Sequence, residues 1–89
     1  MIRSFRSKGL EELWKTGTTK KIDRRMLKRI MRRLEALHLA ERPQDLNIPS
    51  FDFHRLSDGR YTLHVNGPWC ITFEFEKDDA HRVDYEQYH

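Results

Sequence analysis

Two runs of alternating apolar and polar residues near the end of the chain constrain its fold most strongly. They span residues 60–66 and 69–76, and alternation of this kind is the period of a half-buried strand. Asn66-Gly67 lies between the runs and favours a tight hairpin turn, while Pro68 is tolerated only at a strand start or a sheet edge. The pattern predicts an antiparallel hairpin with one apolar face. That face would consist of Tyr61, Leu63, Val65, Trp69, Ile71, Phe73 and Phe75.

Shorter stretches extend the predicted sheet on both sides of this hairpin. A turn at residues 77–79 leads into a further strand with the same alternation. Residues 51–56 have the composition of a strand, and residues 57–59 have that of its turn into the hairpin. Residues 2–5 are a candidate for a short first strand. We therefore expect a sheet of about four to five strands, below the usual upper limit for one small sheet.

The clearest helix is predicted over residues 23–37. Asp23 is a good N-cap, and Ile22 and Leu27 have the spacing of a hydrophobic staple. Apolar residues recur at helical period as one stripe, which we expect to pack on the sheet and to bury Trp69. The stripe is formed by Met26, Leu27, Ile30, Met31, Leu34 and Leu37. The six cations expected to face outward are Arg24, Arg25, Lys28, Arg29, Arg32 and Arg33.

A shorter helix precedes it, with Ser7 as its cap and Gly17 at its end. Residues 38–50 carry two prolines and are interpreted as a connection. The order is one short strand, two helices and then four strands, so the sequence predicts one α+β domain over residues 1–89. In this fold a small twisted, antiparallel-rich sheet has both N-terminal helices packed on one face.

Charge is unevenly distributed along the chain. Residues 1–40 carry twelve Lys and Arg against four Asp and Glu, a net of +8, whereas residues 41–89 carry five against ten, a net of −5. This asymmetry predicts a basic face that favours nucleic acid, but a solvated helix surface explains it equally well. Cys70 is the single cysteine and no apolar run is long enough to span a membrane, so we expect a cytoplasmic location and no membrane partner.

The sequence lacks most of the patterns of nucleotide and metal chemistry. The five histidines form no zinc pattern, and there is no glycine-rich phosphate loop and no GxSxG elbow, so we expect neither a metal nor a cofactor. The chain does end on Tyr88-His89. Metal-free RNA cleavage uses such groups, because a base takes the ribose 2′-OH proton and an acid protonates the leaving oxygen. On these residues alone, a surface histidine without a role is the alternative.

Several segments together resemble the HigB-like toxins of the RelE/ParE superfamily, the toxin halves of bacterial type II toxin–antitoxin pairs. The resemblance begins with MIRSFRSKGLEELWKTG, continues through residues 23–37 and FDFHRL, and is clearest in VNGPWCITFEF and VDYEQYH. It implies a toxin that enters the ribosomal A site and cuts the mRNA codon there, without a metal, with the 2′-OH as nucleophile. It also implies a helix-turn-helix antitoxin as partner, with operator DNA reached only through that antitoxin.

The resemblance implies which residues form the site. His89 and Tyr88 match the terminal pair of the family, and His54 matches the histidine of the strand before the turn. Gln87 stands where the family often has Asp. The implied contacts with ribosomal RNA come from the helix cations, among them Arg24, Lys28 and Arg32.

Two departures from the family pattern remove cations from the expected RNA-binding face. Cys70 stands where the family usually has Arg, and Ser57 stands where it often has Lys. Arg60 or Arg55 would substitute, and we expect Arg60 to lie near the phosphate. Losing one charge-stabilising group costs about 10²–10³ in rate. The alternatives are therefore an attenuated homologue that acts as an RNA- or antitoxin-binding regulatory module, or a superfamily toxin with another target such as DNA gyrase.

Overall fold

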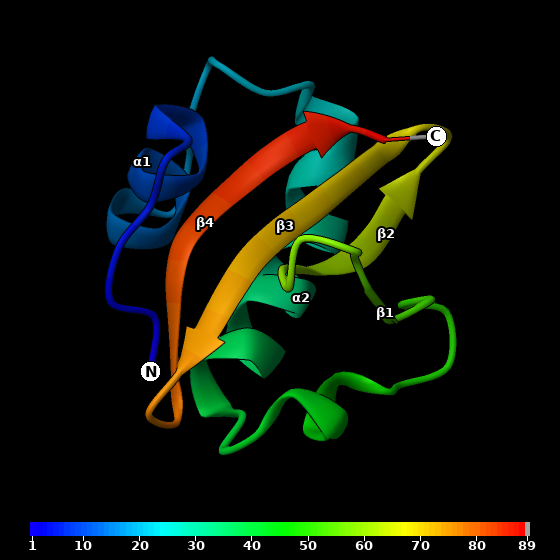
Figure 1. The fold of residues 1–89 in the computed structure, drawn as a ribbon. Coiled ribbons are helices and arrows are strands. Elements are labelled where there is room, and N and C mark those ends of the chain that lie inside the picture. The colour runs from blue at the N-terminus through cyan, green and yellow to red at the C-terminus, as the bar shows by residue number, and fades with distance from the viewer. Residues whose placement is uncertain (89) are drawn as a thin grey trace.

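Two helices lie on one face of a four-stranded antiparallel sheet with strand order β1-β2-β3-β4, which is the α+β class expected from the sequence (Figure 1). The computed structural model describes residues 1–88, and His89, the expected terminal acid or base, lies outside the described residues. The helical elements are α1 (Lys8–Thr16), η1 (Arg24–Met26, a 3-10 turn), α2 (Leu27–Leu39) and η2 (Pro43–Leu46, a 3-10 turn). The strands are β1 (His54–Arg55), β2 (Tyr61–Asn66), β3 (Trp69–Glu76) and β4 (Asp79–Gln87).

Local capping fixes both ends of α1 and the start of the helical segment that contains η1 and α2. The Ser7 hydroxyl accepts a hydrogen bond from the backbone N–H of Leu10 at 3.1 Å, and Gly17 ends α1 in the left-handed region at φ 87°. The Asp23 side chain accepts the backbone N–H of Arg25 and thereby caps η1, from which the chain continues directly into α2. These caps confirm the predicted starts, although the second helix opens with a 3-10 turn and extends to Leu39.

Tight turns join the three long strands. Gly67 and Pro68 connect β2 to β3, one residue later than the predicted dipeptide, and Gly67 has φ 55°. Lys77 and Asp78 connect β3 to β4 with φ 53° and 67°, the pair of positive values that matches the twist of a two-residue hairpin. Both predicted hairpins are therefore confirmed.

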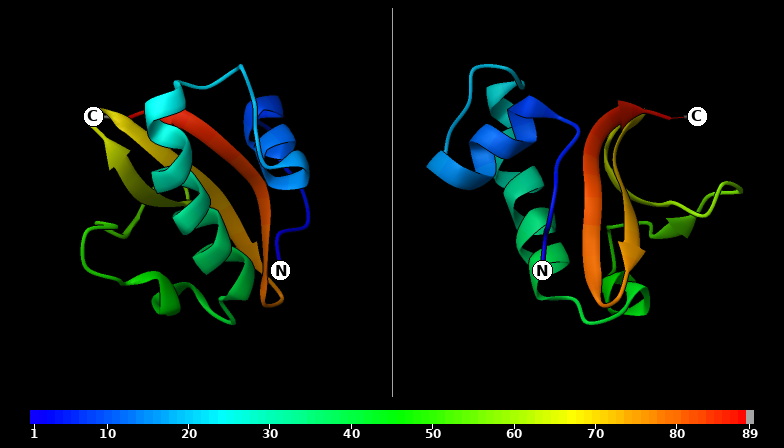
Figure 2. Two further views of the ribbon diagram at one scale, coloured as in Figure 1. Left: turned by 180° about the vertical axis from the view of Figure 1, so that it is seen from behind. Right: turned by 60° about the vertical axis from the view of Figure 1, so that its left-hand side comes forward.

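The core lies between the sheet and the helices α1 and α2, and neither α-helix of residues 1–88 covers the opposite face of the sheet (Figure 2). Leu34 and Leu37 of α2 meet Leu63, Ile71 and Phe73 of the sheet, and all five side chains are fully buried. In the right-hand view of Figure 2, β1 and the C-terminal end of the described chain lie on the side of the sheet away from the helices. None of the helices in residues 1–88 is long and apolar enough to cross a lipid bilayer.

Two predicted strands are much shorter than expected. The strand predicted over residues 51–56 is reduced to β1, because Asp52 has φ 46° and turns the chain before His54. Phe51 still acts as an edge partner, since its carbonyl accepts the backbone N–H of His64 at 2.7 Å. The predicted strand at residues 2–5 contributes only two isolated parallel bridges to the outer edge of β4.

Trp69 is not buried under α2 as predicted. It lies at the end of the sheet, partly exposed, and stacks on Tyr85 with ring centroids 4.6 Å apart. The two rings belong to neighbouring strands and share the helix side of the sheet with Ile22 and Met26. The prediction had the correct face, but α2 does not cover the sheet as far as this end.

Arg33 is the one of the six helix cations that faces inward, contrary to prediction. Its side chain is buried, with 4% exposure, and its guanidinium carbon lies 4.6 Å from the centre of the Phe51 ring. Nε donates to the carbonyl of His64 at 2.6 Å and Nη2 to that of Ser50 at 3.2 Å, while Nη1 donates to Arg29 of its own helix at 2.9 Å. Burial is the main cause that lowers the pKa of Arg33. The guanidinium thus hydrogen-bonds the carbonyl of His64, on the edge of β2 that extends beyond the short strand β1.

Candidate active site

A pocket of about 320 Å³ on the helix-free face brings together four of the residues predicted for the site. They are His54 and Arg55 from β1, Cys70 from β3, and Tyr88, which follows β4. We call this cavity the open-face pocket. Its full lining is Asp52, His54, Arg55, Leu56, Thr62, His64, Gly67, Cys70 and Tyr88.

Strand pairing places these side chains next to one another. His54 is the Cα partner of Thr62 across β1 and β2, and His64 is the partner of Cys70 across β2 and β3. Because side chains alternate along a strand, residues 62, 64 and 70 point away from the core that their neighbours enter. The backbone N–H of Tyr88 donates to the carbonyl of Pro68 at 2.6 Å, which brings the end of the chain to the pocket.

The ring of His54 is oriented by the backbone just before it. Nδ1 lies 2.7 Å from the carbonyl oxygen of Asp52 and 3.6 Å from its carboxylate Oδ1. A carbonyl only accepts, so this contact favours the tautomer with the proton on Nδ1 and leaves Nε2 able to accept a proton. His54 therefore has the geometry of a base or, once protonated, of an acid.

A second histidine of the pocket, His64, was not among the predicted site residues. Its Nε2 lies 3.0 Å from the carbonyl oxygen of Gly67, so the ring also braces the β2–β3 turn. The alternation along β2 puts His64 on the other face of the sheet from Leu63 and Val65, and this pattern could have identified it as a residue of the open face. Its contact with the turn gives it a structural role in the pocket wall.

Cys70 contributes no charge to the pocket. Burial raises the pKa of its thiol, and the carboxylates of Asp52 and Glu86 raise it further. Its Sγ donates weakly to the carbonyl of Pro68 at 3.9 Å. A protonated thiol therefore occupies this position on the sheet.

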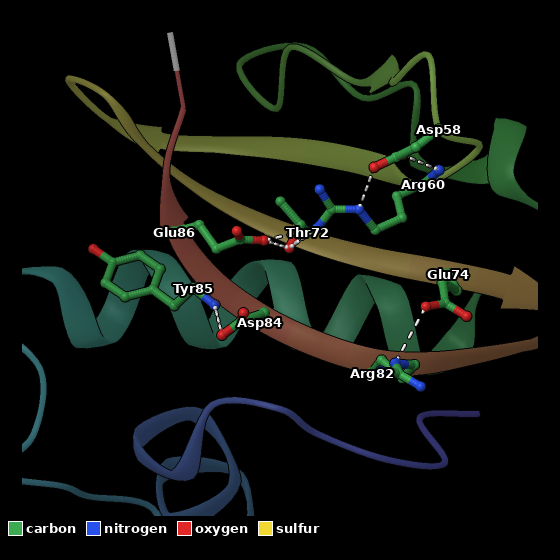
Figure 3. A network of polar contacts seen from close by, with 8 residues as sticks. All are labelled: Asp58, Arg60, Thr72, Glu74, Arg82, Asp84, Tyr85 and Glu86. Carbon is green, nitrogen blue, oxygen red and sulfur yellow. Dashed lines mark hydrogen bonds and ion pairs between the residues drawn. The ribbon is translucent and has the colours of Figure 1, made fainter.

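Arg60 does not line the open-face pocket; it lines a separate hollow with Asp58 and Glu74 and belongs to a polar cluster (Figure 3). Its Nε is 3.0 Å from Asp58 Oδ2 and its Nη1 is 2.9 Å from Glu86 Oε2. Nη1 also lies 3.5 Å from the hydroxyl of Thr72, which is fully buried and itself donates to Glu86. We call Asp58, Arg60, Thr72 and Glu86 the Arg60 network.

Hydrogen bonding dominates the electrostatics of the Arg60 network. The bond to Asp58 is the main cause that raises the pKa of Arg60, and the bonds from Arg60 in turn lower the pKa of Asp58. Thr72 and Glu86 were not predicted as site residues. Both sit at positions that alternate with apolar ones, Ile71 and Tyr85, but their contact with Arg60 depends on cross-strand register.

The remaining predicted residues lie outside the pocket. Ser57 is exposed in the turn after β1, and Gln87 is exposed at the end of β4. The three helix cations predicted to contact RNA are exposed on η1 and α2, on the other side of the sheet from the open-face pocket. We call them the basic helix face: Arg24, Lys28 and Arg32.

Comparison of the chain with known proteins identifies a family that it matches. Residues 3–89 match the family described as the RelE-like toxin of the type II toxin–antitoxin system HigB. A relative from Proteus vulgaris named endoribonuclease HigB is 36% identical over 92 residues, an alignment that covers all of both chains.

Proposed function

From the premise that the chain belongs to the HigB-like family of toxins in type II toxin–antitoxin systems, we propose that it is an endoribonuclease that cuts mRNA on the ribosome. Membership of this family gives it an antitoxin as partner. We propose a helix-turn-helix antitoxin, through which operator DNA would be reached, and a cytoplasmic site of action.

The observation that supports this proposal is the convergence of His54, Arg55 and Tyr88 in one pocket on the helix-free face. In the proposed reaction a base takes the proton of the ribose 2′-OH, and that oxygen attacks the adjacent phosphorus. The bond from phosphorus to the 5′-oxygen breaks, and an acid protonates the leaving oxygen. The products are a 2′,3′-cyclic phosphate and a 5′-hydroxyl.

His54 and His89 are the proposed acid and base, because an imidazole exchanges protons near neutral pH. His54 has one ring nitrogen held by Asp52, which orients the other for proton transfer. Tyr88 is proposed to stack on a base or to donate a proton, since every base presents a π-face to an aromatic ring. Arg60 is the proposed cation near the phosphate, at the side of the pocket.

The basic helix face is proposed to bind ribosomal RNA rather than the scissile strand. Its three cations are exposed and lie on the far side of the sheet from the pocket. Contacts with phosphates supply affinity without sequence readout, and their strength falls with salt.

The test is cleavage of a defined mRNA by purified protein in the presence of programmed ribosomes, with the cut sites mapped. His54→Ala is expected to reduce cleavage by about 10²–10⁴-fold, the range for loss of a positioned acid or base. His81→Ala is the matched control, because His81 lies in β4 and does not line the pocket. An mRNA with a 2′-deoxy nucleotide at the cut site should remain intact. Cleavage of that mRNA would refute the 2′-OH mechanism.

The small number of cations available to a phosphate in the pocket supports a second candidate, an attenuated homologue. Arg60 is bound by two carboxylates and Cys70 supplies no charge, so Arg55 is the one cation among the described residues that line the pocket. Induced expression distinguishes the candidates. Growth arrest that depends on His54 supports the nuclease, whereas unimpaired growth with normal antitoxin binding supports the binding module.

A further inference from the structure

We propose that Glu86 acts as an electrostatic brake on this site, holding the Arg60 guanidinium away from the RNA phosphate. The inference rests on the proposed endoribonuclease function and concerns how fast that site can work. It identifies Glu86 as a residue that tunes the reaction through Arg60, without itself touching RNA.

The position of Glu86 supports this role. Its carboxylate lies 2.9 Å from Arg60 Nη1 and also accepts from the hydroxyl of Thr72. In the β3–β4 register Glu86 is the Cα partner of Cys70, which forms part of the pocket wall. The carboxylate that holds Arg60 is therefore attached directly beside the place where the phosphate would bind.

The charge balance of the Arg60 network opposes a phosphate. One guanidinium faces two carboxylates, those of Asp58 and Glu86, so the three groups together carry a net negative charge. A phosphate that is to be stabilised by Arg60 must share the guanidinium with Glu86 or displace it, and must approach close to that carboxylate. At a separation of a few ångströms this repulsion is significant even near a protein surface. Both effects raise the barrier to cleavage.

Thr72 helps to hold the Glu86 carboxylate in place. It is fully buried, and its hydroxyl anchors the carboxylate of Glu86 in the orientation that reaches Arg60. Arg60 has 23% of its side chain exposed and Glu86 has 31%, so the pair is only partly exposed to solvent. Such a pair retains more of its Coulomb energy than a fully solvated one.

Glu86→Gln is the informative substitution. The amide has the shape of the carboxylate and keeps an oxygen for Thr72 and Arg60, but it removes the charge. Single-turnover cleavage on programmed ribosomes is expected to rise on the order of tenfold. That is below the ~10²–10³ that a fully engaged charge-stabilising group supplies, because Asp58 still binds Arg60.

Glu74→Gln is the matched control. It makes the same charge change on β3, but the carboxylate of Glu74 pairs with Arg82 at 3.3 Å and not with Arg60 (Figure 3). Its cleavage rate is expected to stay within about twofold of wild type, as for a screened surface pair. The double variant Arg60→Met/Glu86→Gln is expected to lose the gain, because the gain acts through Arg60.

Each outcome decides the proposal, provided that circular dichroism shows the variants folded. A wild type that cleaves and a Glu86→Gln variant that is equal or slower overturn the brake and leave the nuclease intact. A gain that persists in the double variant also overturns it, because Arg60 is then not the group released. If neither wild type nor Glu86→Gln cuts mRNA, the endoribonuclease proposal fails and the brake fails with it.

Discussion

Replacing Arg33 with Met is expected to destabilise the protein strongly, although the residue lies in a helix full of surface cations. Methionine retains much of the apolar contact with Phe51 but has no donors. Two carbonyls from other elements, those of His64 and Ser50, lose their hydrogen bonds. The Arg29 carbonyl lies in the same helix and keeps its place in the helical ladder.

The magnitude follows from the two carbonyls. An unsatisfied buried acceptor costs about 1–3 kcal/mol, and the cost for exposed Ser50 is at the low end because water can reach it. We therefore expect a loss of roughly 2–4 kcal/mol in the free energy of unfolding, a large share of the ~5 kcal/mol typical of the least stable small domains. The melting temperature should fall by at least ~8 °C.

Urea unfolding of the purified variant, followed by tryptophan fluorescence, measures this loss. Arg32→Met is the matched control, because Arg32 is the adjacent helix cation and is exposed. It should change the free energy of unfolding by less than ~0.5 kcal/mol. If Arg33→Met is equally mild, the buried guanidinium does not stabilise the edge of β2, and the reasoning from its hydrogen bonds to His64 and Ser50 is wrong.

Three further predictions concern charge. Cys70→Arg is expected to raise cleavage severalfold. The gain should be larger in combination with Glu86→Gln, because residues 70 and 86 are Cα partners and the Glu86 carboxylate would otherwise pair with the new cation. Unchanged single-turnover rates would contradict this prediction. Replacing all three residues of the basic helix face with Glu should weaken co-sedimentation with ribosomes and flatten its salt dependence, and intact co-sedimentation would show that this face is only solvated. Hydrogen bonds from Arg25 lower the pKa of Asp23 to about 2. The stability that Asp23 adds is therefore present above about pH 4 and lost as pH falls toward 2, so the difference in melting temperature between wild type and Asp23→Asn should shrink over that range; a constant difference would refute the assignment.

The parts of the fold that could be predicted are those that local sequence determines. Alternation and a two-residue turn specify a hairpin without reference to the rest of the chain, and β2 to β4 follow the predicted pattern. The caps at Ser7, Gly17 and Asp23 are likewise contacts within a few residues. The helix stripe predicted which face packs on the sheet, because its period depends only on helix geometry.

The parts that could not be predicted depend on contacts between distant segments. Arg33 lies three residues after Ile30 and four before Leu37, at the edge of the stripe, and only the carbonyls of β2 and of Ser50 decide that it turns inward. A charged residue at such a position is normally assigned to the surface. The length of α2 relative to the sheet decides that Trp69 stays partly exposed.

The same limit applies to the candidate site. The alternation of β3 placed Cys70 on the face opposite Ile71, and the lining of the pocket agrees with that prediction. The pairing of Arg60 with Glu86 depends on register, and the register shifts between Thr72 and Glu74. A shift of one residue moves a side chain to the other face, so no sequence pattern could identify this contact. The roles assigned to His54, Tyr88 and their neighbours stay predictions.

The uneven charge of the chain offers a physical reason for the proposed dependence on the ribosome. Residues 1–40, with a net charge of +8, include the basic helix face, whereas residues 41–89, with a net charge of −5, include the pocket and the Arg60 network. With this charge distribution we expect free RNA to be attracted to the helices and repelled from the sheet, so that it rarely reaches the pocket. A ribosome would solve this problem, because its RNA can bind the helices while it holds the mRNA against the opposite face. On this reasoning salt should weaken the binding of ribosomes far more than it slows the cleavage step once the protein is bound.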